Sequence, residues 1–176
     1  MKLCALVIGH KKTSPGASNK NSGLTEFEFN DSLAQLIEAS VTNVRIQRVY
    51  RRTYNTLPED LNQLDPDFII SLHCNAFNTK ASGTETLYYH KSVKGKKIAE
   101  ILNDNFVSAL GLKDRGVKGK SVEDRGGFLL KTTKAPCVIA EPFFIDNDQD
   151  LDTVEANHTE LVQAYSNSIE AIAEVI

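Results

Sequence analysis

The sequence has no hydrophobic run long enough to cross a membrane. Its longest apolar run is the six residues from Leu3 to Ile8, and a spanning helix needs about 20. That run is also too short for an ordinary secretory signal, and no small-residue cleavage site follows it. An excess of basic residues is missing too, because the formal net charge is −3. We therefore expect neither a membrane span nor a general nucleic-acid-binding surface.

Cysteine is scarce, and its three positions, Cys4, Cys74 and Cys137, cannot all pair with one another. None of them has the CxxC spacing of a metal or redox motif. Each lies within an apolar run, where a free cysteine behaves as a small buried hydrophobic residue. We expect three buried free thiols and synthesis in a reducing compartment.

The composition is that of an ordinary globular domain. The chain has 176 residues, of which 41% are hydrophobic and 24% are charged, so neither disorder nor a fibrous rod is expected. No internal repeat, low-complexity tract or linker divides the sequence. Residues 1–176 are therefore predicted to form a single domain.

Short apolar runs between polar residues predict strands. Three continuous runs indicate strands that are buried on both faces, as in a mainly parallel sheet: Leu3–Ile8, Phe68–Leu72 and Cys137–Ala140. Two runs that alternate more nearly between apolar and polar residues predict outer strands: Val44–Tyr50 and Thr86–Tyr89.

Between these runs, apolar residues recur at helical spacing. This spacing predicts helices over Glu26–Ser40, with Thr25 as the N-cap, and over Ile98–Leu110. A third helix covers the C-terminal tail, where Asn157 and Glu160 have the spacing of a capping box. Alternating strands and helices predict an α/β fold, a sheet flanked by helices.

Charge is unevenly distributed along the second half of the chain. The segment from Lys113 to Lys134 contains seven basic and three acidic residues and is rich in glycine. We expect it to form a loop beside the functional site, with a weak attraction for anionic polymers.

Chemically active side chains follow the three buried strands. His10 stands just after the first strand, His73 directly after the second and Glu141 directly after the third. In open α/β sheets, ligands bind in the crevice outside the carboxyl ends of the strands. We therefore expect these three side chains to converge in one cleft.

Two histidines and a carboxylate are a ligand set that catalytic zinc uses, with water in the fourth position. His10 and His73 supply the imidazoles. Glu26 is the best third ligand, because it begins a helix behind a loop with glycine and proline; Glu28 is the alternative. Glu141 then remains for proton transfer to and from a metal-activated water and the leaving amine.

A resemblance to a known family rests on six segments that follow one another along the chain. They are Gly9-His10, Ser14-Pro15-Gly16-Ala17, Gly23-Leu24-Thr25-Glu26, Ser71-Leu72-His73-Cys74-Asn75-Ala76, Gly83-Thr84-Glu85 and Glu141-Pro142-Phe143-Phe144-Ile145-Asp146-Asn147. Together they resemble the zinc-dependent N-acetylmuramoyl-L-alanine amidases of the amidase-3 type. This family includes bacterial autolysins and catalytic domains of phage endolysins.

The resemblance implies one zinc ion per chain, bound by His10, Glu26 and His73, with Glu141 as the catalytic carboxylate. It implies cleavage of the amide between N-acetylmuramic acid and L-alanine in peptidoglycan. It also implies a twisted mixed, mainly parallel sheet with helices on both faces.

Two further residues, Asn75 and Glu85, are expected near the metal as substrate-binding or supporting groups. The implied place of action is the cell wall, outside the cytoplasm. Since no signal peptide or wall-binding module is visible, release at lysis or another export route is expected. The sequence does not indicate an oligomeric state.

Two other functions remain open from the residues. One is a zinc peptidase of carboxypeptidase-like architecture, which would need an arginine, Arg115 or Arg125, for a terminal carboxylate. The other is a module that binds muropeptides without cutting them. The presence of all four expected active groups argues against the second alternative.

Overall fold

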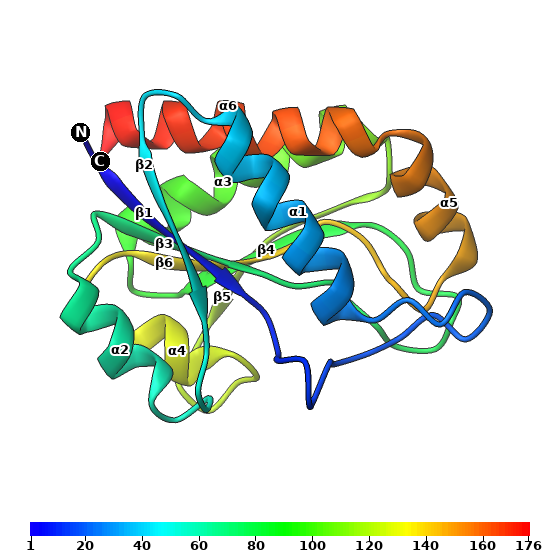
Figure 1. Ribbon diagram of the computed structural model, residues 1–176, viewed down its shortest axis with the longest axis horizontal. Coiled ribbons are helices and arrows are strands. Elements are labelled where there is room, and N and C mark those ends of the chain that lie inside the picture. Colours follow the sequence, from blue (N-terminus) through cyan, green and yellow to red (C-terminus); the bar gives the residue numbers. More distant parts are fainter.

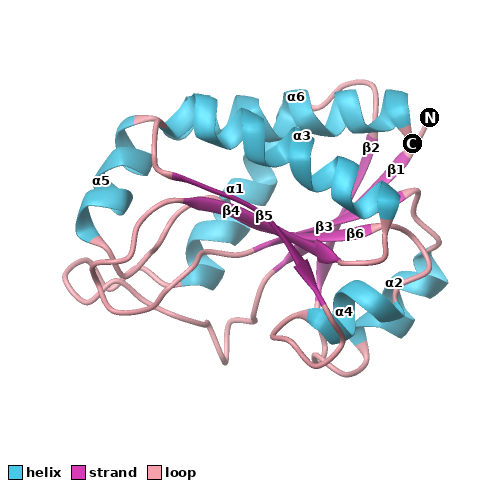
Figure 2. Cartoon of the chain, turned by 180° about the vertical axis from the view of Figure 1, so that it is seen from behind, coloured by secondary structure: helices cyan, strands magenta, loops and turns pink.

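Six strands form one sheet, and helices pack against both of its faces (Figures 1 and 2). The structure is a computed structural model that describes residues 1–176. The strands are β1 (Leu3–Ile8), β2 (Arg45–Tyr50), β3 (Phe68–Leu72), β4 (Thr84–Tyr89), β5 (Asp114–Lys120) and β6 (Cys137–Glu141). The helices are α1 (Glu26–Ser40), α2 (Leu57–Leu64), α3 (Val93–Leu110), α4 (Gly127–Thr132), α5 (Asp148–Ala156) and α6 (His158–Val175).

The sheet is mixed but mostly parallel, with the strand order β2-β1-β3-β6-β4-β5. Strands β2, β1, β3 and β6 run parallel to one another, and β4 is antiparallel to β6. The carboxyl ends of β1, β3 and β6 therefore meet at one edge of the sheet. The predicted α/β fold with helices on both faces is confirmed.

The two faces of the sheet are covered by different helices (Figure 2). On one face, α1, α3 and α6 close over a core of 29 buried residues. On the other face, the short helices α2 and α4 cover a smaller core of 10 buried residues. Because both faces are covered, β1, β3 and β6 are apolar along most of their length.

The predicted strands with continuous apolar runs are confirmed, and one predicted outer strand is placed differently. β1 and β3 have the predicted bounds, and β2 is an outer strand as expected. The expectation that β4 is an outer strand is wrong, since it lies between β6 and β5. Its alternation of polar and apolar residues reflects partial exposure, not an edge position.

The basic, glycine-rich segment is not one loop, contrary to the prediction. It contains β5, which is the actual outer strand, and the short helix α4. No residue of β5 is buried, so this edge strand carries no hydrophobic pattern by which the sequence could reveal it.

One predicted helix cap is confirmed and another is wrong. Thr25 forms a capping box: its hydroxyl accepts from the amide of Glu28, whose carboxylate accepts from the amide of Thr25. Asn157 makes no side-chain cap to α6. The chain leaves α5 and enters α6 at this residue, and the Asn157 side chain donates instead to the Thr153 carbonyl.

All three cysteines are buried and free, as predicted. None of the helices combines the length and the apolar character needed to cross a membrane.

Candidate metal centre

His10 leaves the end of β1 through a strained turn. Its φ of 65° lies in the left-handed region, which residues other than glycine seldom adopt. The chain then folds back so that Gly16 packs on the imidazole, where a Cβ would lie 2.6 Å from His10 Cδ2. The turn and this glycine together fix the direction of the His10 ring.

His73 continues the line of β3, and its amide donates to the Ala140 carbonyl of β6 at 3.0 Å. The ring lies against Gly9, where a Cβ would be only 2.7 Å from His73 Cε1. The two imidazoles meet edge to face, with ring centroids 5.1 Å apart. Glycine at position 9 therefore leaves the space that the His73 ring occupies.

Glu26 is the first residue of α1, and its side chain is only 1% exposed. Backbone amides orient both carboxylate oxygens: Ala17 donates to Oε1 at 3.0 Å, and Cys74 donates to Oε2 at 3.2 Å. The Glu26 amide in turn donates to the Ala17 carbonyl. The loop before α1 thus returns to the sheet edge, as its glycine and proline content suggested.

Glu26 Oε2 lies 3.2 Å from His10 Nε2 and 3.4 Å from His73 Nδ1. Ligand atoms of all three residues lie within 4.8 Å of one another. His10 Nε2 is buried without a hydrogen-bond partner, and a buried nitrogen of this kind is costly unless it binds a partner. Two imidazoles and one carboxylate are donors that zinc prefers, so these residues fit a zinc ion.

The electrostatics of the group also favour a cation. Burial raises the pKa of Glu26, but the two adjacent imidazoles outweigh burial and hold that pKa well below its usual range. Burial is the main cause that lowers the pKa of His73. Glu26 is therefore ionised and His73 is neutral near pH 7, which are the forms that bind metal.

Glu28, the alternative ligand, lies away from this group. It is exposed, and its carboxylate is occupied by the capping box with Thr25. A side chain two positions further along a helix points to another face. Glu26 therefore reaches the histidines and Glu28 does not.

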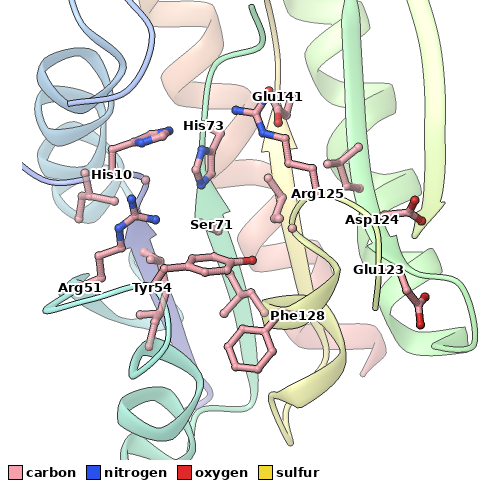
Figure 3. Close-up of a pocket in the computed structure, with 18 residues that line it drawn as sticks. His10, Arg51, Tyr54, Ser71, His73, Glu123, Asp124, Arg125, Phe128 and Glu141 are labelled. Atoms are coloured by element: carbon pink, nitrogen blue, oxygen red, sulfur yellow. The ribbon is translucent and has the colours of Figure 1, made fainter. Parts of the chain in front are cut away.

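Glu141 ends β6 and lines the same cavity as His10 and His73 (Figure 3). Burial raises the pKa of Glu141 to about 8, and the negative charge of Glu26 acts in the same direction. The rule that ligands bind outside the carboxyl ends of the strands (the strand-end rule) thus accounts for the position of all three side chains.

The cavity has a volume of about 370 Å³ and lies on the α2 and α4 side of the sheet. Side chains of β1, β3, β4 and β6 form part of its lining, together with residues next to α2 and α4. It is large enough for a substrate segment beside the His–Glu–His group.

Asn75 and Glu85 lie beside one another, outside this cavity. Asn75 Nδ2 donates to Glu85 Oε1 at 2.9 Å, and Arg115 Nε donates to Glu85 Oε2 at 2.8 Å. Glu85 is also the register partner of Glu141 across the β4–β6 ladder. The network supports the strand end that carries Glu141.

Sequence reasoning missed three side chains of the cavity: Arg51, Tyr54 and Phe128. Arg51 had a usable signal, because it directly follows β2 and therefore obeys the same strand-end rule as His73. The two aromatic residues had none, because the packing of α2 against α4 brings them together, with ring centroids 5.9 Å apart.

Comparisons with known proteins agree on one family. The sequence profile described as N-acetylmuramoyl-L-alanine amidase matches residues 4–171. N-acetylmuramoyl-L-alanine amidase LytC of Bacillus subtilis (strain 168) is 29% identical over 151 residues, which are 81% of this chain and 29% of LytC. The chain thus spans less than a third of that relative's length.

Solved structures show the same fold. The catalytic domain of CwlV, an N-acetylmuramoyl-L-alanine amidase from Bacillus (Paenibacillus) polymyxa var. colistinus, has a TM-score of 0.85 at 21% identity, and all of both chains is covered. An N-acetylmuramoyl-L-alanine amidase from Clostridium difficile 630 also has a TM-score of 0.85, at 20% identity, with 99% of this chain and 97% of the other covered.

Proposed function

The chain belongs to the amidase-3 family of N-acetylmuramoyl-L-alanine amidases, and on that premise we propose that it is a zinc-dependent peptidoglycan amidase. The bond it cleaves is the amide between N-acetylmuramic acid and L-alanine. The observation that carries this proposal is the convergence of two imidazoles and the Glu26 carboxylate within 4.8 Å, at the edge of the cavity that Glu141 lines.

His10, Glu26 and His73 are the proposed zinc ligands. Each has a fixed direction: the imidazoles pack against glycines, and the carboxylate accepts two backbone hydrogen bonds. A zinc ion supplies a Lewis acid that activates water and polarises the scissile carbonyl.

Glu141 is the proposed general base and acid. Its carboxylate would take a proton from the attacking water and deliver it to the amine of L-alanine as the amide breaks. Without metal, burial raises the pKa of Glu141 to about 8; a bound zinc ion would lower it toward the neutral range, where a group that must both accept and release a proton works best.

Asn75 and Glu85 are proposed as supporting residues. The hydrogen bonds from Asn75 and Arg115 fix Glu85, and Glu85 pairs with Glu141 in the β4–β6 ladder. Through this ladder they would hold the Glu141 end of β6 in place.

Peptidoglycan as substrate implies action at the cell wall. We propose that residues 1–176 work there as one catalytic domain, since they form a single sheet with its two helical layers.

Product analysis tests the proposed function. Purified peptidoglycan is digested with the protein, and the soluble products are identified by mass spectrometry. The expected products are stem peptides that begin with a free L-alanine, together with glycan strands that keep their lactyl groups. Controls are protein treated with a chelator and the Glu141→Gln variant, both of which should release far less than the wild type in the same time.

Other products would contradict the proposal. Release of single residues from the carboxyl ends of stem peptides would indicate a carboxypeptidase. Retention of peptidoglycan by the wild-type protein without any cleavage, in the presence of zinc, would indicate a binding module.

A further inference from the structure

Two arginines face the cavity from opposite sides of the catalytic group. Arg51 follows β2 and lines the cavity beside His10, and Arg125 precedes α4 and reaches toward Glu141 (Figure 3). Their charges act on the group from these two sides: Arg51 affects the pKa of His73, and Arg125 affects the pKa of Glu141.

Both arginines lack a carboxylate partner, unlike three of the other four arginines of the chain. Arg51 and Arg125 form no ion pair or side-chain hydrogen bond. The paired arginines are Arg48 with Glu38 at 2.7 Å, Arg52 with Asp60 at 2.6 Å and Arg115 with Glu85 at 2.8 Å.

Arg51 is partly buried, and desolvation lowers its pKa. A guanidinium in such a place is stabilised by an anion that accepts its paired N–H groups. Its carbon lies 5.7 Å from the centroid of the Tyr54 ring, a cation–π contact that restrains the side chain. The guanidinium is thus held in position with its donors free.

No carboxylate in or beside the cavity forms an ion pair with either arginine, although the charge of Glu26 acts on Arg51 and Arg125 acts on Glu141. Glu123 and Asp124 also line it, but both carboxylates turn away from His10 and His73 (Figure 3). Asp124 accepts two hydrogen bonds from Ser121. The positive charges of Arg51 and Arg125 therefore remain available to a ligand in the cavity.

We propose that Arg51 and Arg125 form a carboxylate-recognition subsite, which selects stem peptides with a free carboxylate on the residue after L-alanine. This inference rests on the proposed amidase function. The cavity wall also has apolar residues, among them Val7, Leu57 and Ile139, which suit the hydrocarbon part of such a peptide. A peptide whose carboxylate is amidated leaves the two guanidinium groups unpaired and binds less well.

Two synthetic substrates test the subsite. Both contain N-acetylmuramoyl-L-alanine followed by a glutamate linked through its side chain; the α-carboxylate is free in one and amidated in the other. A charge-assisted hydrogen bond corresponds to about 10- to 100-fold in kcat/KM, so we expect the wild type to prefer the free acid by at least about 10-fold.

Charge-removing variants assign the preference to the two residues. Arg51→Gln and Arg125→Gln should each lower the ratio of kcat/KM on the free acid to kcat/KM on the amide by about 10-fold or more, whatever loss of turnover the two substrates share. Arg45→Gln is the matched control, because Arg45 is exposed on β2, lies outside the cavity and has no ion pair. Equal wild-type rates on both substrates, or equal losses on both in the variants, would overturn the subsite.

Direct binding separates the subsite from the proposed function. Calorimetry with Glu141→Gln protein measures the affinity for both compounds without turnover, alone and combined with Arg51→Gln. If the wild type cleaves neither compound but the free acid still binds at least about 10-fold more tightly, the subsite stands and the amidase function fails. If both compounds bind equally, the subsite fails whatever the wild type cleaves.

Discussion

The two faces of the sheet differ in how completely side chains fill the space under their helices. The face covered by α1, α3 and α6 has a core of 29 buried residues. The face covered by α2 and α4 has 10 buried residues and a cavity of about 370 Å³. The larger core supplies most of the buried contacts that stabilise the sheet. The smaller face can therefore keep an open cavity.

Each central strand contributes side chains to the cores on both faces. In β1, Cys4, Leu6 and Ile8 point into the larger core, and Ala5 and Val7 point into the smaller one. Close packing on one side thus fixes the strand ends that carry the proposed catalytic residues on the other. The geometry of the proposed site depends on the core at the opposite face of the sheet.

The largest expected effect belongs to the open face. Glu141→Gln should lower kcat by about 10²- to 10⁴-fold, because the variant cannot transfer a proton, and should still bind zinc. Steady-state kinetics and metal analysis of one preparation check both parts. Glu123→Gln removes another carboxylate that lines the cavity and should stay within about 3-fold of wild type, since we assign it no role in proton transfer.

Matched leucine substitutions compare the two cores directly. Leu102 of α3 is 0% exposed in the larger core, and Leu57 of α2 is 2% exposed at the cavity. Leu102→Ala should lower the free energy of unfolding by about 4 kcal/mol, and Leu57→Ala by about 2 kcal/mol, because water can enter the space next to the cavity. Chemical denaturation of the metal-free variants measures the difference. Equal losses would mean that the cavity face is packed as tightly as the other.

The pH dependence of stability should reveal Glu141 in the metal-free protein. Burial raises its pKa from 4.5 to about 8 in the folded state. A raised folded-state pKa contributes stability that is complete below the unfolded value and is lost as the pH rises through the folded value. Metal-free Glu141→Gln should therefore unfold like wild type near pH 4 and be more stable by about 4 to 5 kcal/mol at pH 9.

Urea denaturation of both metal-free proteins at these two pH values gives the comparison. The other titratable groups are the same in both proteins, so their contributions largely cancel. A difference that is constant between the two pH values would mean that Glu141 titrates at an ordinary pKa.

Much of the fold could be predicted because its central strands are buried on both sides. β1, β3 and α1 have the predicted bounds, since continuous apolar runs and a capping box are strong local signals. β5, α2, α4 and α5 had no such signal, because they are short, polar or at an edge. The placement of β4, antiparallel to β6 and parallel to β5, depends on tertiary packing that no local pattern encodes.

The predicted site depended on one topological rule and one resemblance. The ends of parallel strands predicted that His10, His73 and Glu141 would lie together, and the structure places all three at one cavity. The loop before α1 and the family resemblance favoured Glu26 over Glu28. The cavity itself could not be predicted, because it forms where two short helices fail to cover the sheet completely.

Zinc content per chain tests the central claim most directly. Atomic spectrometry of purified protein should find about one zinc ion per wild-type chain and far less in Glu26→Gln. Glu28→Gln is the matched control: it removes a neighbouring carboxylate that only caps the same helix, and it should keep the metal. Circular dichroism checks that both variants are folded. A wild-type chain without zinc, or a Glu26→Gln chain that binds it fully while Glu141→Gln loses it, would contradict the account.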